Sequence, residues 1–150
     1  MLLITEDKVL LGLKGRGVGQ GKIVAVGGGV EEAETIREAA IRETIEEIGV
    51  APNNPIAVAD LNFVFPYKHE YSMHVFVYLS QSWSGEILAT DELEPRWFEI
   101  QNLPFEQMWA DAPYWLPRVL AGEKLKAEFF YDKNLEIERK QVEKCDCKYF

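Results

Sequence analysis

The chain has 150 residues, of which 47% are hydrophobic, and a formal net charge of -9. This length fits a single domain over residues 1–150 that buries about two-thirds of its unfolded surface, so we expect a hydrophobic core. The negative charge argues against binding to duplex nucleic acid or to an anionic membrane surface. No run approaches the roughly 20 apolar residues of a membrane span, and no secretory signal opens the chain, so the cytoplasm is the expected location.

Short strands are predicted at the start of the chain. Residues 1–4 and 9–14 are apolar runs separated by a polar turn. The glycine-rich segment 15–21 follows and leads into a third strand over residues 22–26. Because this segment joins two strands, it does not match the strand, loop and helix order of a dinucleotide-binding fingerprint.

A helix is predicted over residues 36–48. Thr35 with Glu38 three residues later forms a capping box, and Gly49 is a C-terminal stop signal. At about 100° per residue, one side of this helix collects apolar residues that we expect to face the core. These residues are Ile41, Ile45 and Ile48.

The same helix carries three glutamates near its end, Glu43, Glu46 and Glu47. Like charges at these spacings cost roughly 0.2–0.5 kcal/mol per pair, and the negative end of the helix dipole disfavours each exposed anion by about 0.3–1 kcal/mol. We therefore expect a positive group beside them. Clustered carboxylates are typical ligands of Mg²⁺, which keeps its remaining positions for water and substrate phosphates. The alternative is an acidic helix face in solvent.

The rest of the chain predicts further strands and one short helix. The strands are expected at residues 57–65, 73–79, 96–100, 127–131 and 135–140. The helix is expected at residues 114–121, interrupted by Pro117. Strands outnumber helices and do not alternate regularly with them, which indicates a mixed α/β sandwich.

Cys145 and Cys147 are the only cysteines in the sequence. Two cysteines one residue apart provide neither a disulfide framework nor a four-ligand zinc site. We expect both to be reduced and to have no metal-binding role.

The spacing around the acidic helix resembles the Nudix box. Its specified positions in this chain are Gly28, Glu34, Arg42, Glu43, Glu46, Glu47, Gly49 and Val50. Thr44 stands where the box has an apolar residue, and Ile45 is expected to supply the missing core contact. The resemblance implies an α/β Nudix fold, the α/β/α sandwich with a mixed β-sheet. It also implies hydrolysis of a nucleoside diphosphate linked to another group.

The resemblance further implies roles for these residues. Glu43, Glu46 and Glu47 are the expected catalytic ligands of Mg²⁺, with Mn²⁺ able to replace it, and the carbonyl of Gly28 joins them. Arg42 is expected to orient a neighbouring glutamate by a charge-assisted hydrogen bond, and Glu34 is expected to shape the loop.

Members of the family often take one more acidic residue from a distant loop. Glu92, in the segment 90–93, is our candidate for this general base and additional metal ligand. The alternative for Glu92 is a turn carboxylate in solvent, because exposed acidic residues are common.

Residues 9–17 and 104–117 resemble the oxidised-purine nucleoside triphosphatases, the 8-oxo-dGTP diphosphatase branch of the family. By this resemblance, Lys14 lies near the substrate and Phe63 forms a wall of its pocket. Trp109 stacks on the base, an interaction worth about 1–3 kcal/mol, and Asp111 reads the purine edge.

Two base-reading positions depart from this branch. Ala112 replaces a second aspartate, and Val24, also at a substrate-binding position, replaces an asparagine. A site that loses polar contacts loses discrimination, so we expect a broader or shifted purine preference. For Tyr114 and Trp115 the alternative to a substrate role is core packing.

Three functions remain open from the sequence. The first is Mg²⁺-dependent hydrolysis of purine nucleoside triphosphates, including 8-oxo-dGTP, to a monophosphate and pyrophosphate by water attack at a phosphorus. The second is hydrolysis of another linkage, in a nucleotide sugar, a dinucleoside polyphosphate or an RNA 5′ end. The third is a nucleotide-binding module without catalysis, whose signature of degenerate acidic positions is not seen. The expected partner is a small nucleotide, and the sequence does not predict the oligomeric state.

Overall fold

The computed structural model describes residues 1–146 of the protein. The described residues group into two compact units, residues 1–56 with 78–108 and residues 57–77 with 109–146. Each unit holds parallel and antiparallel strand pairs and one α-helix, so the predicted α/β class with a mixed sheet is confirmed. None of the described helices is long and apolar enough to cross a membrane.

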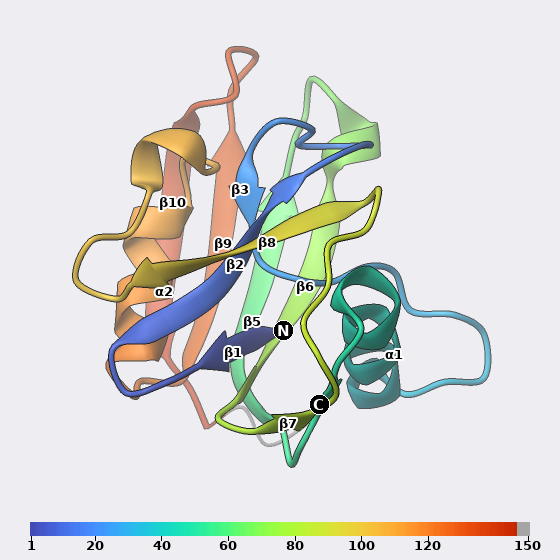
Figure 1. Cartoon of the computed structure of the whole chain (residues 1–150). Coiled ribbons are helices and arrows are strands. Elements are labelled where there is room, and N and C mark those ends of the chain that lie inside the picture. Colours follow the sequence, from blue (N-terminus) through green and yellow to red (C-terminus); the bar gives the residue numbers. More distant parts are fainter. Residues whose placement is uncertain (147–150) are drawn as a thin grey trace. The chain divides into compact units, whose positions relative to one another are not determined.

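The first unit is built around one central strand, β2 (Lys8–Lys14). It pairs antiparallel with β1 (Leu2–Ile4), β3 (Ile23–Val24) and β8 (Leu93–Glu99) (Figure 1). The end of β6 (Met73–Ser80) adds a parallel pairing with β1. The apolar residues of β1 and the middle of β2 are buried, which places the core of this unit at these strands.

Two short strands of the first unit were not predicted. They are β4 (Ala51–Pro52) and β7 (Trp83–Ser84), which pair antiparallel with each other. Two residues are too few to leave a periodic signal in the sequence. The predicted strand at residues 96–100 begins earlier, at Leu93, because the whole of β2 is available for it to pair with.

The helix α1 (Ile36–Ile48) has the predicted bounds. At its start, the Glu38 amide donates to Thr35 Oγ1 at 3.1 Å and the Thr35 amide donates to the Glu38 carboxylate at 2.8 Å. At its end, Gly49 has a φ of 81° and its amide donates to the Ile45 carbonyl at 2.9 Å. A positive φ favours glycine, so both ends of α1 are set by local sequence.

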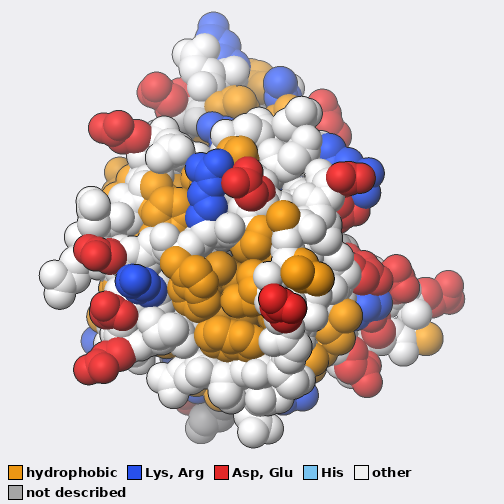
Figure 2. Space-filling model, viewed as in Figure 1, with side chains coloured by type: hydrophobic (Ala, Val, Ile, Leu, Met, Phe, Trp, Pro, Cys, Tyr) orange, Lys and Arg blue, Asp and Glu red, His pale blue; other side chains and the backbone are white. Residues whose placement is uncertain are grey.

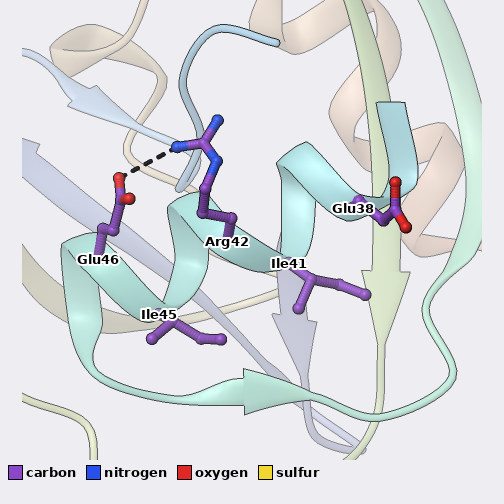
Figure 3. Close-up of a pocket in the computed structure, with 5 residues that line it drawn as sticks. All are labelled: Glu38, Ile41, Arg42, Ile45 and Glu46. Carbon is purple, nitrogen blue, oxygen red and sulfur yellow. Dashed lines mark hydrogen bonds and ion pairs between the residues drawn. The ribbon is translucent and has the colours of Figure 1, made fainter. Parts of the chain in front are cut away.

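The buried side of α1 differs from the prediction. Ile48 is fully buried, but Ile45 is 47% exposed and Ile41 is partly exposed. Figure 3 shows Ile41 and Ile45 pointing to the same outer side of the helix. Thr44 is fully buried instead, with its hydroxyl donating to the Ala40 carbonyl at 2.7 Å. The expectation that Ile45 replaces Thr44 in the core is therefore wrong, because Thr44 satisfies its own polar atom and packs there itself.

The second unit contains β5 (Ile56–Val64), β9 (Leu125–Tyr131), β10 (Ile137–Lys144) and α2 (Ala112–Leu120). β9 pairs antiparallel with β10 and parallel with β5, and β6 lies next to β5. Alternate residues of β9 are buried, and α2 packs on this strand. The helix starts two residues before the predicted position and keeps Pro117 inside it.

The state of Cys145, near the end of the described residues, differs from the prediction. Cys145 is disulfide-bonded, so the expectation of a reduced thiol is wrong at this position. Cys147 lies outside the described residues.

Candidate active site

Three carboxylates converge in the first unit. Glu43 and Glu47 come from α1, Glu92 comes from the segment before β8, and one oxygen of each lies within 4.8 Å of the others. Two hydrogen bonds tie the two parts of the chain together. Thr90 Oγ1 donates to the Glu47 carbonyl at 2.8 Å, and the Leu88 amide donates to the Ile48 carbonyl at 2.9 Å. The end of α1 thus holds the segment that presents Glu92.

The loop before α1 also contacts these carboxylates. The Gly27 amide donates to Glu47 Oε2 at 3.2 Å. A Cβ atom at Gly28 would lie 2.2 Å from Cδ of Glu43, so any other residue would displace either this carboxylate or the loop. The close approach places the Gly28 backbone beside the acidic group, where its carbonyl is predicted to act as a metal ligand.

Arg42 joins this loop to the helix. Its guanidinium donates to both carboxylate oxygens of Glu34, at 2.9 and 2.6 Å, and to the Gly29 carbonyl at 2.9 Å. It also donates to Glu43 at 3.0 Å, which orients that carboxylate toward the cluster. The hydrogen bond from Arg42 is the main reason that the pKa of Glu34 falls to about 2. Glu34 therefore shapes the loop through Arg42.

Glu46 lies outside the group of three carboxylates. Its side chain is 56% exposed and accepts a hydrogen bond from Arg42 at 3.2 Å (Figure 3). Beside it on the outer side of α1 is a pocket of about 360 Å³, which shares Glu46 and Arg42 with the site but none of the three clustered carboxylates. A role of Glu46 as a metal ligand stays a prediction.

The cluster carries unbalanced negative charge. Glu47 is 8% exposed, and burial is the main reason that its pKa rises from 4.5 to about 7. The charges of Glu43 and Glu92 act in the same direction, whereas the Gly27 amide and the charge of Lys14 oppose them. In the view of Figure 2, further acidic side chains gather over α1 and the loop before it. The converging carboxylate oxygens fit a hard divalent cation such as Mg²⁺ or Mn²⁺.

Glu92 has a partner that the sequence did not single out. Its Oε1 accepts a hydrogen bond from Arg16 at 2.5 Å, although 76 residues separate the two. Arg16 lies in the glycine-rich segment between β2 and β3, and nothing local in the sequence pairs it with Glu92. Of the other predicted residues in this unit, Lys14 ends β2, and Val24 is half-buried in β3.

The predicted base-binding residues lie in the second unit. Trp109 packs edge-on against three aromatic rings, those of Phe65, Tyr71 and Tyr131, at centroid distances of 5.8, 6.1 and 6.1 Å. Trp109 itself is half-buried. Phe63 stacks on Phe129 at 5.6 Å. These contacts give Trp109 a fixed orientation within an aromatic cluster.

Asp111 is buried together with its own hydrogen-bond donors. The Tyr131 hydroxyl donates to one carboxylate oxygen, and Trp115 Nε1 donates to the other at 2.7 Å. The Asp111 amide in turn donates to the Tyr131 hydroxyl at 3.1 Å. Burial raises the pKa of Asp111, and both side-chain hydrogen bonds oppose this rise.

Three neighbours of Asp111 complete this part of the second unit. Trp115 is buried, Tyr114 is 41% exposed and Ala112 is buried at the start of α2. The role of Tyr131 was missed, because only its place in a strand is readable from the sequence.

Comparisons with known proteins fit this arrangement. A NUDIX domain matches residues 1–119. A Danio rerio protein described as an oxidized purine nucleoside triphosphate hydrolase is 36% identical over 141 residues, covering 93% of this chain and 90% of the relative. A Mus musculus protein with the same description is 34% identical over 135 residues, covering 89% and 86%. The crystal structure of a MutT protein from Bacillus halodurans matches with a TM-score of 0.79 at 25% identity, covering 95% of this chain and 94% of that one.

Proposed function

Because the chain belongs to the Nudix hydrolase family, we propose that it cleaves purine nucleoside triphosphates, oxidised ones such as 8-oxo-dGTP included, into a nucleoside monophosphate and pyrophosphate. One observation carries this proposal. Glu43, Glu47 and Glu92 converge within 4.8 Å in a chain that is 36% identical to an oxidized purine nucleoside triphosphate hydrolase.

The carboxylates of this cluster would hold Mg²⁺, or Mn²⁺ in its place. Oxygen donors are what these hard cations take from a protein. Glu46 and the Gly28 carbonyl are proposed as further ligands. A cation bound there would neutralise phosphate oxygens and lower the pKa of a bound water.

The residues around the cluster have separate tasks in this proposal. Glu92 is the general base that accepts a proton from the attacking water, since its side chain is 44% exposed and its oxygen lies in the cluster. Arg42 holds Glu43 in place, and the Gly27 amide holds Glu47. The water oxygen forms a bond to phosphorus, and pyrophosphate leaves as the phosphorus–oxygen bond breaks.

Trp109 is proposed to stack on the purine base of the substrate, and Asp111 is proposed to contact the edge of that base. Both carboxylate oxygens of Asp111 already accept internal hydrogen bonds, which limits what it can offer a ligand. Ala112 and Val24 remove two polar contacts that the oxidised-purine branch has. We therefore propose a preference for purines that discriminates weakly between oxidised and ordinary bases.

A substrate panel tests this function. Pyrophosphate and monophosphate release is measured with Mg²⁺ for 8-oxo-dGTP, dGTP, dATP, a nucleotide sugar, a dinucleoside polyphosphate and a 5′-triphosphorylated RNA. The proposal predicts fastest turnover of the purine triphosphates, with dGTP and 8-oxo-dGTP within about 10-fold of each other. Slowest turnover of the triphosphates would overturn it in favour of another linkage. Nucleotide binding by calorimetry without any product would instead indicate a binding module.

A further inference from the structure

The glycine-rich segment between β2 and β3 forms two hydrogen bonds with Glu92, the carboxylate of the cluster that does not come from α1. The Gly15 amide donates to the Glu92 carbonyl at 2.9 Å, and Arg16 Nη2 donates to Glu92 Oε1 at 2.5 Å. One contact fixes the backbone of Glu92 and the other its side chain. Adjacent residues of one loop thus specify where this carboxylate lies.

This loop has a defined conformation of its own. The Lys14 amide donates to the Lys22 carbonyl and the Gly21 amide donates to the Lys14 carbonyl, both at 2.9 Å, which closes the loop at its base. A Cβ atom at Gly15 would lie 2.2 Å from the Asp91 carbonyl oxygen. A glycine is therefore needed at position 15 for the loop to approach the segment that carries Glu92.

Glu92 needs such a partner more than the other two carboxylates do. Glu43 is held by Arg42 at 3.0 Å, and Glu47 is 8% exposed and held by the Gly27 amide at 3.2 Å. The Glu92 side chain is 44% exposed, and two like charges repel it toward solvent. Its contact with Arg16 opposes that repulsion while the second carboxylate oxygen of Glu92 stays available.

We propose that Arg16 is a positioning residue that holds the Glu92 carboxylate against Glu43 and Glu47 for metal binding and catalysis. The inference rests on the proposed function, and it adds to that function a residue from outside the box. An exposed ion pair contributes little to stability, so the loss of Arg16 should affect the site and leave the fold intact.

The test compares Arg16→Ala with a matched control, Arg96→Ala. Arg96 forms an ion pair of similar exposure with Glu94 at 3.4 Å, on a strand of the same unit. Mn²⁺ binding is measured by calorimetry and turnover by pyrophosphate release. Arg16→Ala should weaken Mn²⁺ binding and lower kcat by about 10-fold each, as loss of the partner of a metal ligand does. Arg96→Ala should match the wild type, and Arg16→Lys should recover part of the loss.

A double-mutant cycle separates positioning from direct substrate binding. If Arg16 acts through Glu92, then adding Arg16→Ala to Glu92→Gln lowers kcat no further. An additional loss in the double variant, or a rise in KM alone in Arg16→Ala, would show that Arg16 binds the substrate and would overturn the inference. Wild-type Mn²⁺ affinity in Arg16→Ala would overturn it as well.

The metal titration also separates this inference from the proposed function. If the wild type binds Mn²⁺ but cleaves no nucleotide, the function fails, and the affinity of Arg16→Ala still decides the role of Arg16.

Discussion

Each unit buries one acidic side chain, and the two side chains have different neighbours. In the first, Glu47 is buried beside Glu43 and Glu92, and its pKa rises to about 7, mainly because of burial and further because of the charges of Glu43 and Glu92. In the second, Asp111 is equally buried but receives hydrogen bonds from Tyr131 and Trp115. The acids of the first unit could therefore share a divalent cation, whereas both carboxylate oxygens of Asp111 already accept hydrogen bonds.

The largest expected effect is the loss of activity caused by a substitution in the acidic cluster of the first unit. Glu47→Gln removes a proposed ligand from the acidic cluster while keeping the shape of the side chain. We expect kcat/KM with Mg²⁺ to fall by at least about 100-fold, because the cation loses a ligand in a site where it neutralises the phosphates. Steady-state pyrophosphate release measures this. An activity within a few-fold of the wild type would show that the cluster is not the reaction centre.

The same variant is expected to stabilise the protein without metal. The pKa of Glu47 is about 7 in the folded protein and near 4.5 when unfolded, so the folded state binds the proton more tightly. Its contribution to stability is therefore full below about pH 4.5 and is lost as the pH rises to about 7. In EDTA, Glu47→Gln should match the wild type near pH 4.5 and exceed it by about 1–3 kcal/mol at pH 8. Urea unfolding at both values checks this, and an equal difference at both would contradict it.

In the second unit the matching substitution should have the reverse effect on stability. Asp111→Asn keeps only one carbonyl acceptor for the donors of Tyr131 and Trp115, so one donor is left unpaired. We expect a loss of about 1–3 kcal/mol in the free energy of unfolding, with Mn²⁺ affinity unchanged. Chemical denaturation and calorimetry measure the two quantities. If Asp111→Asn stabilised the protein, the expected difference in stability effect between Glu47→Gln and Asp111→Asn would be contradicted.

The smallest effect concerns Thr44. Its hydroxyl is satisfied within α1 by the Ala40 carbonyl, so Thr44→Val removes a donor whose acceptor also belongs to the helix backbone. We expect a change in the free energy of unfolding of less than about 1 kcal/mol and unchanged turnover. Thermal unfolding is sufficient to measure it. A larger loss would mean that Thr44 has a role beyond filling the core.

Local signals predicted part of this molecule well. The bounds of α1 follow from Thr35, Glu38 and Gly49, each of which acts on its own turn of the helix. Helical periodicity also grouped Ile41 and Ile45 with Ile48, but of these three only Ile48 is buried. Which side is buried depends on what packs against the helix, and periodicity carries no information about that.

The contacts that shape the site are long-range. Arg16 and Glu92 are 76 residues apart, and Asp111 and Tyr131 are 20 apart. Such pairs are formed by the tertiary structure, so no spacing rule brings them out of a single sequence. The spacing of the box identified the acidic residues of α1 together with Arg42, which donates to Glu43, whereas the partners of Glu92 and Asp111 became visible only in the fold.

In the proposed function, Glu43, Glu47 and Glu92 form the metal centre of a nucleotide hydrolase. The decisive measurement is pyrophosphate release from 8-oxo-dGTP by the wild type and Glu47→Gln, with Mg²⁺ and with EDTA. We predict release by the wild type with Mg²⁺ and almost none in the other three reactions. Mg²⁺-dependent release that is undiminished in Glu47→Gln would contradict the claim.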